Sequence, residues 1–108
     1  FLNSHPKVKM IVLDSVAFHF RYGFNGKYSL RAKKLHQMAQ SLQKIAASFN
    51  VAVVITNQVT TKVMAEASTL VPALGPSWAH KCTNRVMLQV KDNRRLAKLV
   101  KSPSRKVQ

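Results

Sequence analysis

Two short apolar runs separated by one long amphipathic segment constrain the fold of this chain most strongly. Residues 8–13 and 51–56 are rich in branched apolar side chains and are bounded by polar residues. Such runs are typical of strands that are buried on both faces. Between them, apolar residues recur at helical spacing over about 29–49. Strand, helix and strand in this order predict a βαβ unit with parallel pairing and a right-handed crossover.

The central helix is the best-defined of these elements. Its apolar stripe is formed by Leu35, Met38, Ala39, Leu42, Ile45, Ala46 and Phe49. Its polar face carries Lys33, Lys34, Gln37, Gln40, Gln43 and Lys44. We expect Ser29 to cap its start and Asn50 to end it in the left-handed conformation. The stripe is expected to pack on the sheet rather than to bind a partner.

Polar side chains follow both predicted strands at the point where each strand ends. Asp14 follows the first strand, and Asn57 and Gln58 follow the second. In parallel sheets ligands bind at this edge, where a carboxylate can hold Mg²⁺ through water beside nucleotide phosphates. The alternative is that Asp14 only caps the next turn and that the amides end a strand without a functional role.

The remaining segments give weaker signals. Residues 15–28 predict a short turn and then a flexible loop, because Asn25 and Gly26 form a turn signal. Residues 59–83 lack regular periodicity, which is typical of a functional or mobile loop, with a short helix near 78–83. Residues 85–90 and 95–100 alternate around a polar turn and predict a β-hairpin that extends the sheet. We assign 1–104 to one domain and 105–108 to a basic tail or truncated end.

Charge is the strongest compositional signal. Lys and Arg number 18 against three acids, which gives a formal net charge of +15. This balance favours a polyanionic partner, nucleic acid first and an anionic membrane second, although the acidic part of a longer protein could also be missing. No apolar run is long enough to span a bilayer. A lone cysteine, Cys82, excludes an internal disulfide and indicates an intracellular chain without structural zinc.

Five segments, taken in order, carry a resemblance to a known family. They are residues 10–15 (MIVLDS), 51–59 (VAVVITNQV), 70–75 (LVPALG), 77–80 (SWAH) and 101–104 (KSPS). Together they resemble the second half of the ATPase core of RecA-like strand-exchange recombinases. Within these they are most similar to the C-type group of the eukaryotic recombinase paralogues used in DNA repair. The implied fold is α/β, a partial RecA-like P-loop ATPase core in which parallel strands with a crossover helix precede a β-hairpin.

The resemblance implies nucleotide-linked roles for five residues and a catalytic role for none. Asp14 matches the Walker B carboxylate, which positions Mg²⁺ through water near the β- and γ-phosphates. Gln58 matches an amide that senses the γ-phosphate, and an amide can donate to a phosphate oxygen. His80 matches a histidine that reaches the nucleotide of a neighbouring subunit, and Ser102 and Pro103 match a segment lying over that nucleotide. ATP and Mg²⁺ are therefore the cofactors implied for the parent protein.

Two DNA-binding loops are also implied, within about 19–28 and 59–84. The matching DNA-binding residues are Arg21, Lys27, Thr60, Thr61, Lys62, Lys81 and Arg85. Each role has a structural alternative. In the structural alternative, Arg21 and Lys27 are ordinary solvated charges, and His80 only caps the short helix. Trp78 either stacks on a base or anchors a core or interface.

The chain also departs from the family pattern. It contains no Gly-rich loop ending in Lys-Ser/Thr. Glu66 does not match the family's water-activating glutamate, and the overlying segment begins with Lys101 where the family usually has Asp. With Phe1 rather than Met at its start, the chain is expected to be a fragment or alternative product without independent ATPase activity.

The implied parent binds ATP and single-stranded or branched DNA, and it assists homologous recombination and double-strand break repair. It is expected in the nucleus, with a cytoplasmic pool, in a head-to-tail complex with other recombinase paralogues and without a membrane partner. Two alternatives stay open. One is another RecA-fold DNA motor such as a helicase, and the other is a non-enzymatic basic module that binds nucleic acid through charge alone.

Overall fold

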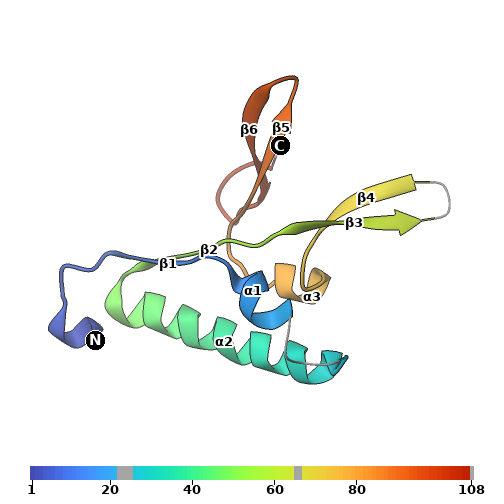
Figure 1. Cartoon of the computed structure of the whole chain (residues 1–108). Helices are drawn as coiled ribbons and strands as arrows, with labels where there is room; N and C mark the ends of the chain where they lie inside the picture. The colour runs from blue at the N-terminus through green and yellow to red at the C-terminus, as the bar shows by residue number, and fades with distance from the viewer. Residues whose placement is uncertain (22–25, 65–66, 108) are drawn as a thin grey trace.

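A βαβ unit forms the centre of the structure, a computed structural model that describes residues 1–21, 26–64 and 67–107 (Figure 1). Strands β1 (Met10–Leu13) and β2 (Ala52–Ile55) pair in parallel, and helix α2 (Tyr28–Phe49) connects them. The predicted parallel unit is therefore confirmed. Each strand is shorter than the apolar run that predicted it.

Within the described residues, the β1–β2 sheet is covered on one face, where α2 runs along it (Figure 1). The side chains that alternate toward α2 are half-buried. On the other face, Met10 and Val12 are each 58% exposed and Val54 is 42% exposed. The expectation of strands buried on both faces is therefore wrong for the described part of the chain, because no second layer covers this face there.

Helix α2 ends as predicted but begins differently. Asn50 is its C-cap in the left-handed conformation, with φ 50° and ψ 49°. Its backbone N–H donates to the carbonyl of Ala46. At the start, Lys27 is the N-cap residue without a side-chain capping bond, so the predicted capping role of Ser29 is wrong. Gly26, with φ +80°, turns the chain before this point, which places Ser29 inside the first helical turn.

The core lies between α2, the ends of the strands and two short helices. Its buried residues include Val16, Leu35, Ala39 and Trp78, and partly buried side chains pack against them. Val16 belongs to α1 (Val16–Arg21), which forms where a turn was predicted. A further short 3₁₀ helix, η1 (Leu2–Ser4), precedes β1. None of the helices in the described ranges has the length and apolar character needed to cross a membrane.

The long segment after β2 is more regular than its sequence suggests. Strands β3 (Val59–Met64) and β4 (Ala67–Pro72) form an antiparallel hairpin, and helix α3 (Pro76–Ala79) follows. The short helix therefore lies earlier than predicted, with proline at its first position, where the missing N–H is tolerated. The hairpin was missed because its connection, which includes Glu66, has no Gly or Asn turn signal. That connection lies outside the described residues.

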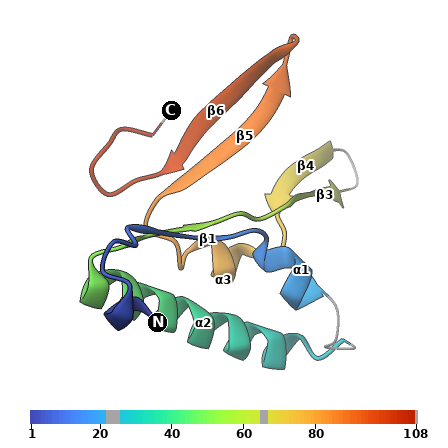
Figure 2. The ribbon, with the colours of Figure 1, turned by 60° about the vertical axis from the view of Figure 1, so that its left-hand side comes forward.

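The last two strands form the predicted hairpin. Strands β5 (Arg85–Lys91) and β6 (Arg94–Lys101) are antiparallel. Asp92 and Asn93 both have positive φ, 51° and 60°, as tight two-residue hairpin turns require. The hairpin projects away from α2 (Figure 2). The expectation that it extends the β1–β2 sheet is wrong, because β5 and β6 form a separate two-stranded sheet. Residues of β2 and the first residues of β5 line one cavity.

Candidate functional site

The carboxyl ends of β1 and β2 bring Asp14 and Thr56 into direct contact. Leu13 pairs with Ile55 in the parallel register, so the next residue of each strand lies at the same edge. There the hydroxyl Oγ1 of Thr56 donates to Oδ1 of Asp14 at 2.6 Å. The backbone N–H of Val16 donates to the Thr56 carbonyl at 3.1 Å. The carboxylate is thus oriented by the neighbouring strand and remains exposed. Only the register identifies Thr56 as its partner.

Asn57 connects the end of β2 to the base of the β3–β4 hairpin. Its Nδ2 donates to the carbonyl of Ala73 at 2.9 Å. Its Oδ1 accepts the backbone N–H of Gln58 at 2.8 Å. The backbone N–H of Ala73 in turn donates to the Gln58 carbonyl at 2.7 Å. Displacement of the exposed Gln58 side chain therefore acts on a backbone segment that is bonded to the foot of the hairpin.

The Asp14 edge suits one part of a nucleotide site. Mg²⁺ prefers oxygen ligands, keeps several waters and usually takes one or two carboxylates together with substrate phosphates. One exposed carboxylate beside a hydroxyl fits that outer position. The chain contains no Gly-rich Lys-Ser/Thr loop, which in such proteins cradles the phosphates. The residues present therefore fit the metal side of the site and leave the phosphate grip to other residues.

A hydrogen bond of Lys101 connects His80 to the segment that begins with Ser102. The ammonium Nζ of Lys101 donates to the carbonyl of His80 at 3.1 Å. This bond joins the residue after α3 to the last residue of β6, immediately before Ser102 and Pro103. The His80 side chain is exposed. One hydrogen bond therefore links the backbone of His80 to the residue immediately before Ser102 and Pro103.

The DNA-binding candidates fall into two groups. Lys81 and Arg85 are partly buried and line a cavity of about 730 Å³ together with Gln58. The other group lies on or beside the loops. Lys27 is exposed at the start of α2, and Thr60 Oγ1 donates across its hairpin to the Val71 carbonyl at 3.4 Å.

Three further candidates are placed by their backbone alone. Arg21 is the last residue of α1, and Thr61 and Lys62 belong to β3. Their side chains lie outside the described part of the chain, as do residues 22–25 of the predicted first loop.

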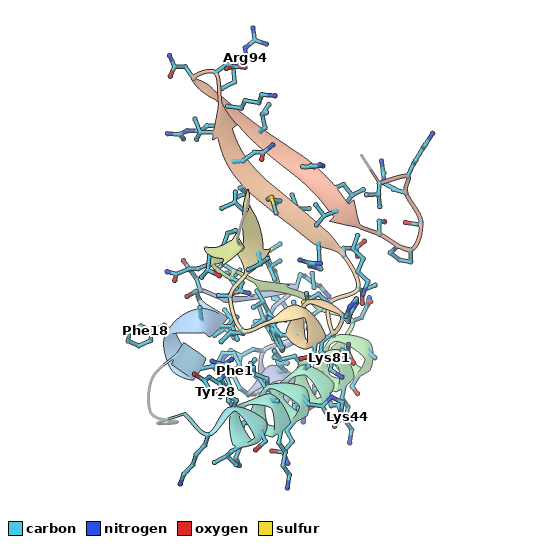
Figure 3. All side chains as sticks on the ribbon, turned by 90° about the vertical axis from the view of Figure 1, so that its right-hand side faces the viewer. Phe1, Phe18, Tyr28, Lys44, Lys81 and Arg94 are labelled. Atoms are coloured by element: carbon cyan, nitrogen blue, oxygen red, sulfur yellow. The ribbon has the colours of Figure 1, made fainter. Side chains whose placement is uncertain are left out.

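Arg31 is a basic residue that sequence reasoning missed. Its guanidinium carbon lies 5.2 Å from the centroid of the Tyr28 ring. Both residues line a second cavity of about 210 Å³ with Lys81 and Trp78. Figure 3 shows Tyr28 near the start of α2 and Lys81 beside the same helix. The signal available in the sequence was the position of Arg31 one turn into the helix that follows the predicted loop.

Trp78 belongs to the core. It is 4% exposed and packs with Val16, Leu35 and Ala39. A ring this deeply buried offers no face to a nucleic-acid base. The core alternative is therefore confirmed over base stacking.

Cys82 is half-buried beside two cations. Burial raises the pKa of its thiol because the thiolate loses solvation, while Arg85 and Lys101 partly offset that rise. We expect iodoacetamide to alkylate Cys82 more slowly at pH 7–8 than a free cysteine, with the rate rising at higher pH. Arg85→Ala removes a cation that favours the thiolate and is expected to slow alkylation further. Mass spectrometry of the alkylated peptide measures this rate, and alkylation as fast as that of free cysteine would contradict the expectation.

Comparison with known proteins decides the family. The Rad51 family profile matches residues 2–107. The chain belongs to the Rad51 family. It is 41% identical over 98% of its length to a "DNA repair protein RAD51 homolog 3" of Cricetulus griseus. The Dictyostelium discoideum protein of the same description is 46% identical over 96% of the chain. The human "Meiotic recombination protein DMC1/LIM15 homolog" is 38% identical over 88%.

These relatives are much longer than the chain. The chain spans 29%, 28% and 30% of the three proteins, in the same order. The expected resemblance to a eukaryotic RecA-like recombinase paralogue is confirmed, and so is the fold class it implied. The Asp14 edge and the segment of Gln58 are accordingly part of a Rad51-family core.

Proposed function

We propose that the full-length protein is a recombinase paralogue that binds ATP with Mg²⁺ and single-stranded or branched DNA, and that it assists homologous recombination. One observation carries the proposal. Residues 56–58 are consecutive and are hydrogen-bonded at both ends: Thr56 to the Asp14 carboxylate, and Asn57 and Gln58 to Ala73 at the foot of the β3–β4 hairpin. A nucleotide at the strand edge and DNA at the hairpin would therefore act on one connected segment.

Within this proposal each residue has a defined task. Bound ATP with Mg²⁺ supplies the γ-phosphate whose presence or absence is sensed. Asp14 orients the hydrated metal from the end of β1, held by the Thr56 hydroxyl. Gln58 would donate a side-chain N–H to the γ-phosphate, and Asn57 accepts the backbone N–H of Gln58 and so holds the backbone beside it. Without the phosphate, Gln58 would lose this partner, and the segment bonded to the hairpin would be free to change position.

The charge of the chain supports a DNA partner. A net charge of +15 attracts phosphates from any polyanion, and in this proposal the loop residues supply the contacts. We assign DNA contacts to Arg21, Lys27, Thr60, Thr61, Lys62, Lys81 and Arg85. These side chains contact the phosphate backbone and carry no sequence preference.

Assembly and location follow from the same assignment. His80, Ser102 and Pro103 are proposed to meet the nucleotide of an adjacent subunit, so the protein stacks head to tail with other recombinase paralogues. Because we propose that the protein acts on chromosomal DNA, we expect it in the nucleus, with a cytoplasmic pool. Residues 1–104 are the contribution of this chain to the ATPase core, and this stretch alone is not expected to hydrolyse ATP.

A salt series of single-stranded DNA binding tests the DNA part. For single strands, the logarithm of affinity falls with the logarithm of salt concentration by about 0.7 for each phosphate contacted. We expect the combined variant Arg21→Ala, Lys27→Ala and Lys62→Ala to bind much more weakly and to reduce this slope by about 2. Fluorescence anisotropy of a labelled oligonucleotide measures both quantities.

The matched control removes three exposed lysines from the polar face of α2. The combined variant Lys33→Ala, Lys34→Ala and Lys44→Ala removes the same number of positive charges, away from the proposed loops. Equal and small losses in both variants would mean that binding reflects net charge alone. That result would favour the non-enzymatic basic module over the recombinase assignment of the loops.

A further inference from the structure

The segment that follows β6 has an unusual combination of residues. Residues 102–106 read Ser-Pro-Ser-Arg-Lys, and after β6 the chain leaves the sheet here and loops back toward the hairpin (Figure 2). Pro103 and Arg105 are exposed, and Ser102 is partly exposed. Pro103 has no N–H to donate and biases Ser102 toward an extended backbone. Kinases that phosphorylate serine before proline prefer a cation two residues beyond the proline, which is the position of Arg105.

We propose that Ser102 is a phosphorylation site for a proline-directed serine/threonine kinase, and that the surrounding basic segment holds the phosphoserine. In the kinase reaction, Oγ of Ser102 attacks the γ-phosphorus of ATP and a new phosphorus–oxygen bond forms. The bond between the γ-phosphorus and the bridging oxygen of ADP breaks, and ADP leaves. The hydroxyl proton passes to the carboxylate base of the kinase.

The local backbone already points donors at the acceptor oxygen. Oγ of Ser102 accepts the backbone N–H of Ser104 at 3.3 Å and that of Arg105 at 3.2 Å. A phosphate on that oxygen carries about two negative charges and three acceptor oxygens, so the same two donors can bind it. Successive backbone N–H groups that converge in this way form an anion-binding concavity.

The side chains around Ser102 supply the matching charge. Lys101, Arg105 and Lys106 are its neighbours along the chain. Within the described residues the acids are Asp14, at the end of β1, and Asp92, at the tip of the hairpin, so neither belongs to this segment. Charge-assisted bonds from lysine and arginine to phosphate are stronger than neutral ones. The segment therefore gains favourable contacts when Ser102 is phosphorylated.

Phosphorylation also affects the connection to α3. Nζ of Lys101 donates to the His80 carbonyl at 3.1 Å, and a phosphate on the next residue competes for that ammonium. The next step rests on the proposed function, in which this segment lies over the nucleotide of a neighbouring subunit. The phosphate on Ser102 would repel the triphosphate of that nucleotide. Phosphorylation of Ser102 is thus a means of weakening head-to-tail assembly.

Phosphorylation of the purified chain by a recombinant cyclin-dependent kinase tests the site directly. Peptide mapping by mass spectrometry is expected to find the phosphate on Ser102. Ser102→Ala should abolish it, while the matched control Ser104→Ala, which has no following proline, should leave it unchanged. Arg105→Ala should lower kcat/KM by about tenfold, since it removes a charge-assisted contact. Phosphate on other residues, or equal labelling of Ser102→Ala, would overturn the proposal.

Nuclear magnetic resonance tests the binding of the phosphate by the segment. The amide protons of Ser104 and Arg105 are expected to shift downfield on phosphorylation, and the second pKa of the phosphate to fall below its usual value of about 6. Unchanged amide shifts and an ordinary phosphate pKa would overturn this part.

The regulatory part is tested on the full-length protein with its partner subunits. Phosphorylation at Ser102 should weaken ATP-dependent assembly by about tenfold, because like charges are brought together at the interface. Unchanged assembly would overturn the regulatory role. If the unphosphorylated protein shows no ATP-dependent assembly at all, the proposed function fails while the mapped phosphorylation site stands.

Discussion

Trp78→Ala is expected to lower the free energy of unfolding by about 3–5 kcal/mol, the usual cost of removing a large buried aromatic side chain. Trp78 is 4% exposed and fills the space between Val16, Leu35 and Ala39. A chain of this size has about 5–15 kcal/mol of stability at most, so the loss removes a large part of it. Urea unfolding followed by far-ultraviolet circular dichroism measures the change.

Phe18→Ala provides the control for this prediction. Phe18 is 69% exposed on α1, so its removal is expected to change the free energy of unfolding by about 0.5 kcal/mol or less. A small loss for Trp78→Ala, comparable to that of Phe18→Ala, would contradict the placement of Trp78 in the core. A loss of DNA affinity with unchanged stability would instead restore the base-stacking alternative.

Asn57→Ala is expected to uncouple the nucleotide edge from the β3–β4 hairpin in the full-length protein. The substitution removes the bond to the Ala73 carbonyl and the bond from the Gln58 N–H. Two such bonds are worth about 2 kcal/mol together, enough to remove a roughly tenfold ATP-dependent gain of DNA affinity. ATP binding itself should change little, because Asp14 and Thr56 are untouched. Anisotropy with labelled DNA and with labelled nucleotide separates the two effects.

Two further variants sharpen this test. Asn57→Asp keeps the acceptor for the Gln58 N–H but places a carboxylate oxygen against the Ala73 carbonyl, so its loss is expected to be at least as large as that of Asn57→Ala. Gln40→Ala removes an exposed amide from the polar face of α2 and should have no effect. Equal DNA affinity gains in Asn57→Ala and the unaltered protein would mean that the hairpin does not respond through this bond.

The βαβ unit could be predicted because its signals are local. The helical spacing from Leu35 to Phe49, the two apolar runs and the left-handed residue Asn50 each reflect short-range physics. The polar strand ends were likewise visible, because parallel strands end at the same edge of a sheet. The hydrogen-bond partner of Asp14 could not be predicted, because it depends on the register that places Leu13 beside Ile55.

Other features depend on contacts that the sequence does not display. The β3–β4 hairpin is rich in β-branched residues, but these carry no alternation of polar and apolar side chains, and its turn lacks Gly and Asn. Ser29 is a good capping residue by type, yet the turn at Gly26 starts the helix before it. The position of Trp78 was undecided between surface and core until its neighbours were known. The β5–β6 hairpin was recognised from its pattern, but its separation from the β1–β2 sheet is a tertiary property.

The most direct test of the account is the affinity of the full-length protein for single-stranded DNA with ATP and Mg²⁺, with ADP and Mg²⁺, and without nucleotide, at one fixed salt concentration. ATP with Mg²⁺ is expected to raise the affinity by about tenfold or more over ADP, within the usual range of coupling between two sites. Asp14→Asn should abolish this difference while leaving nucleotide-free binding unchanged. Equal affinity in all three conditions would contradict the account and leave a protein that binds DNA through charge alone.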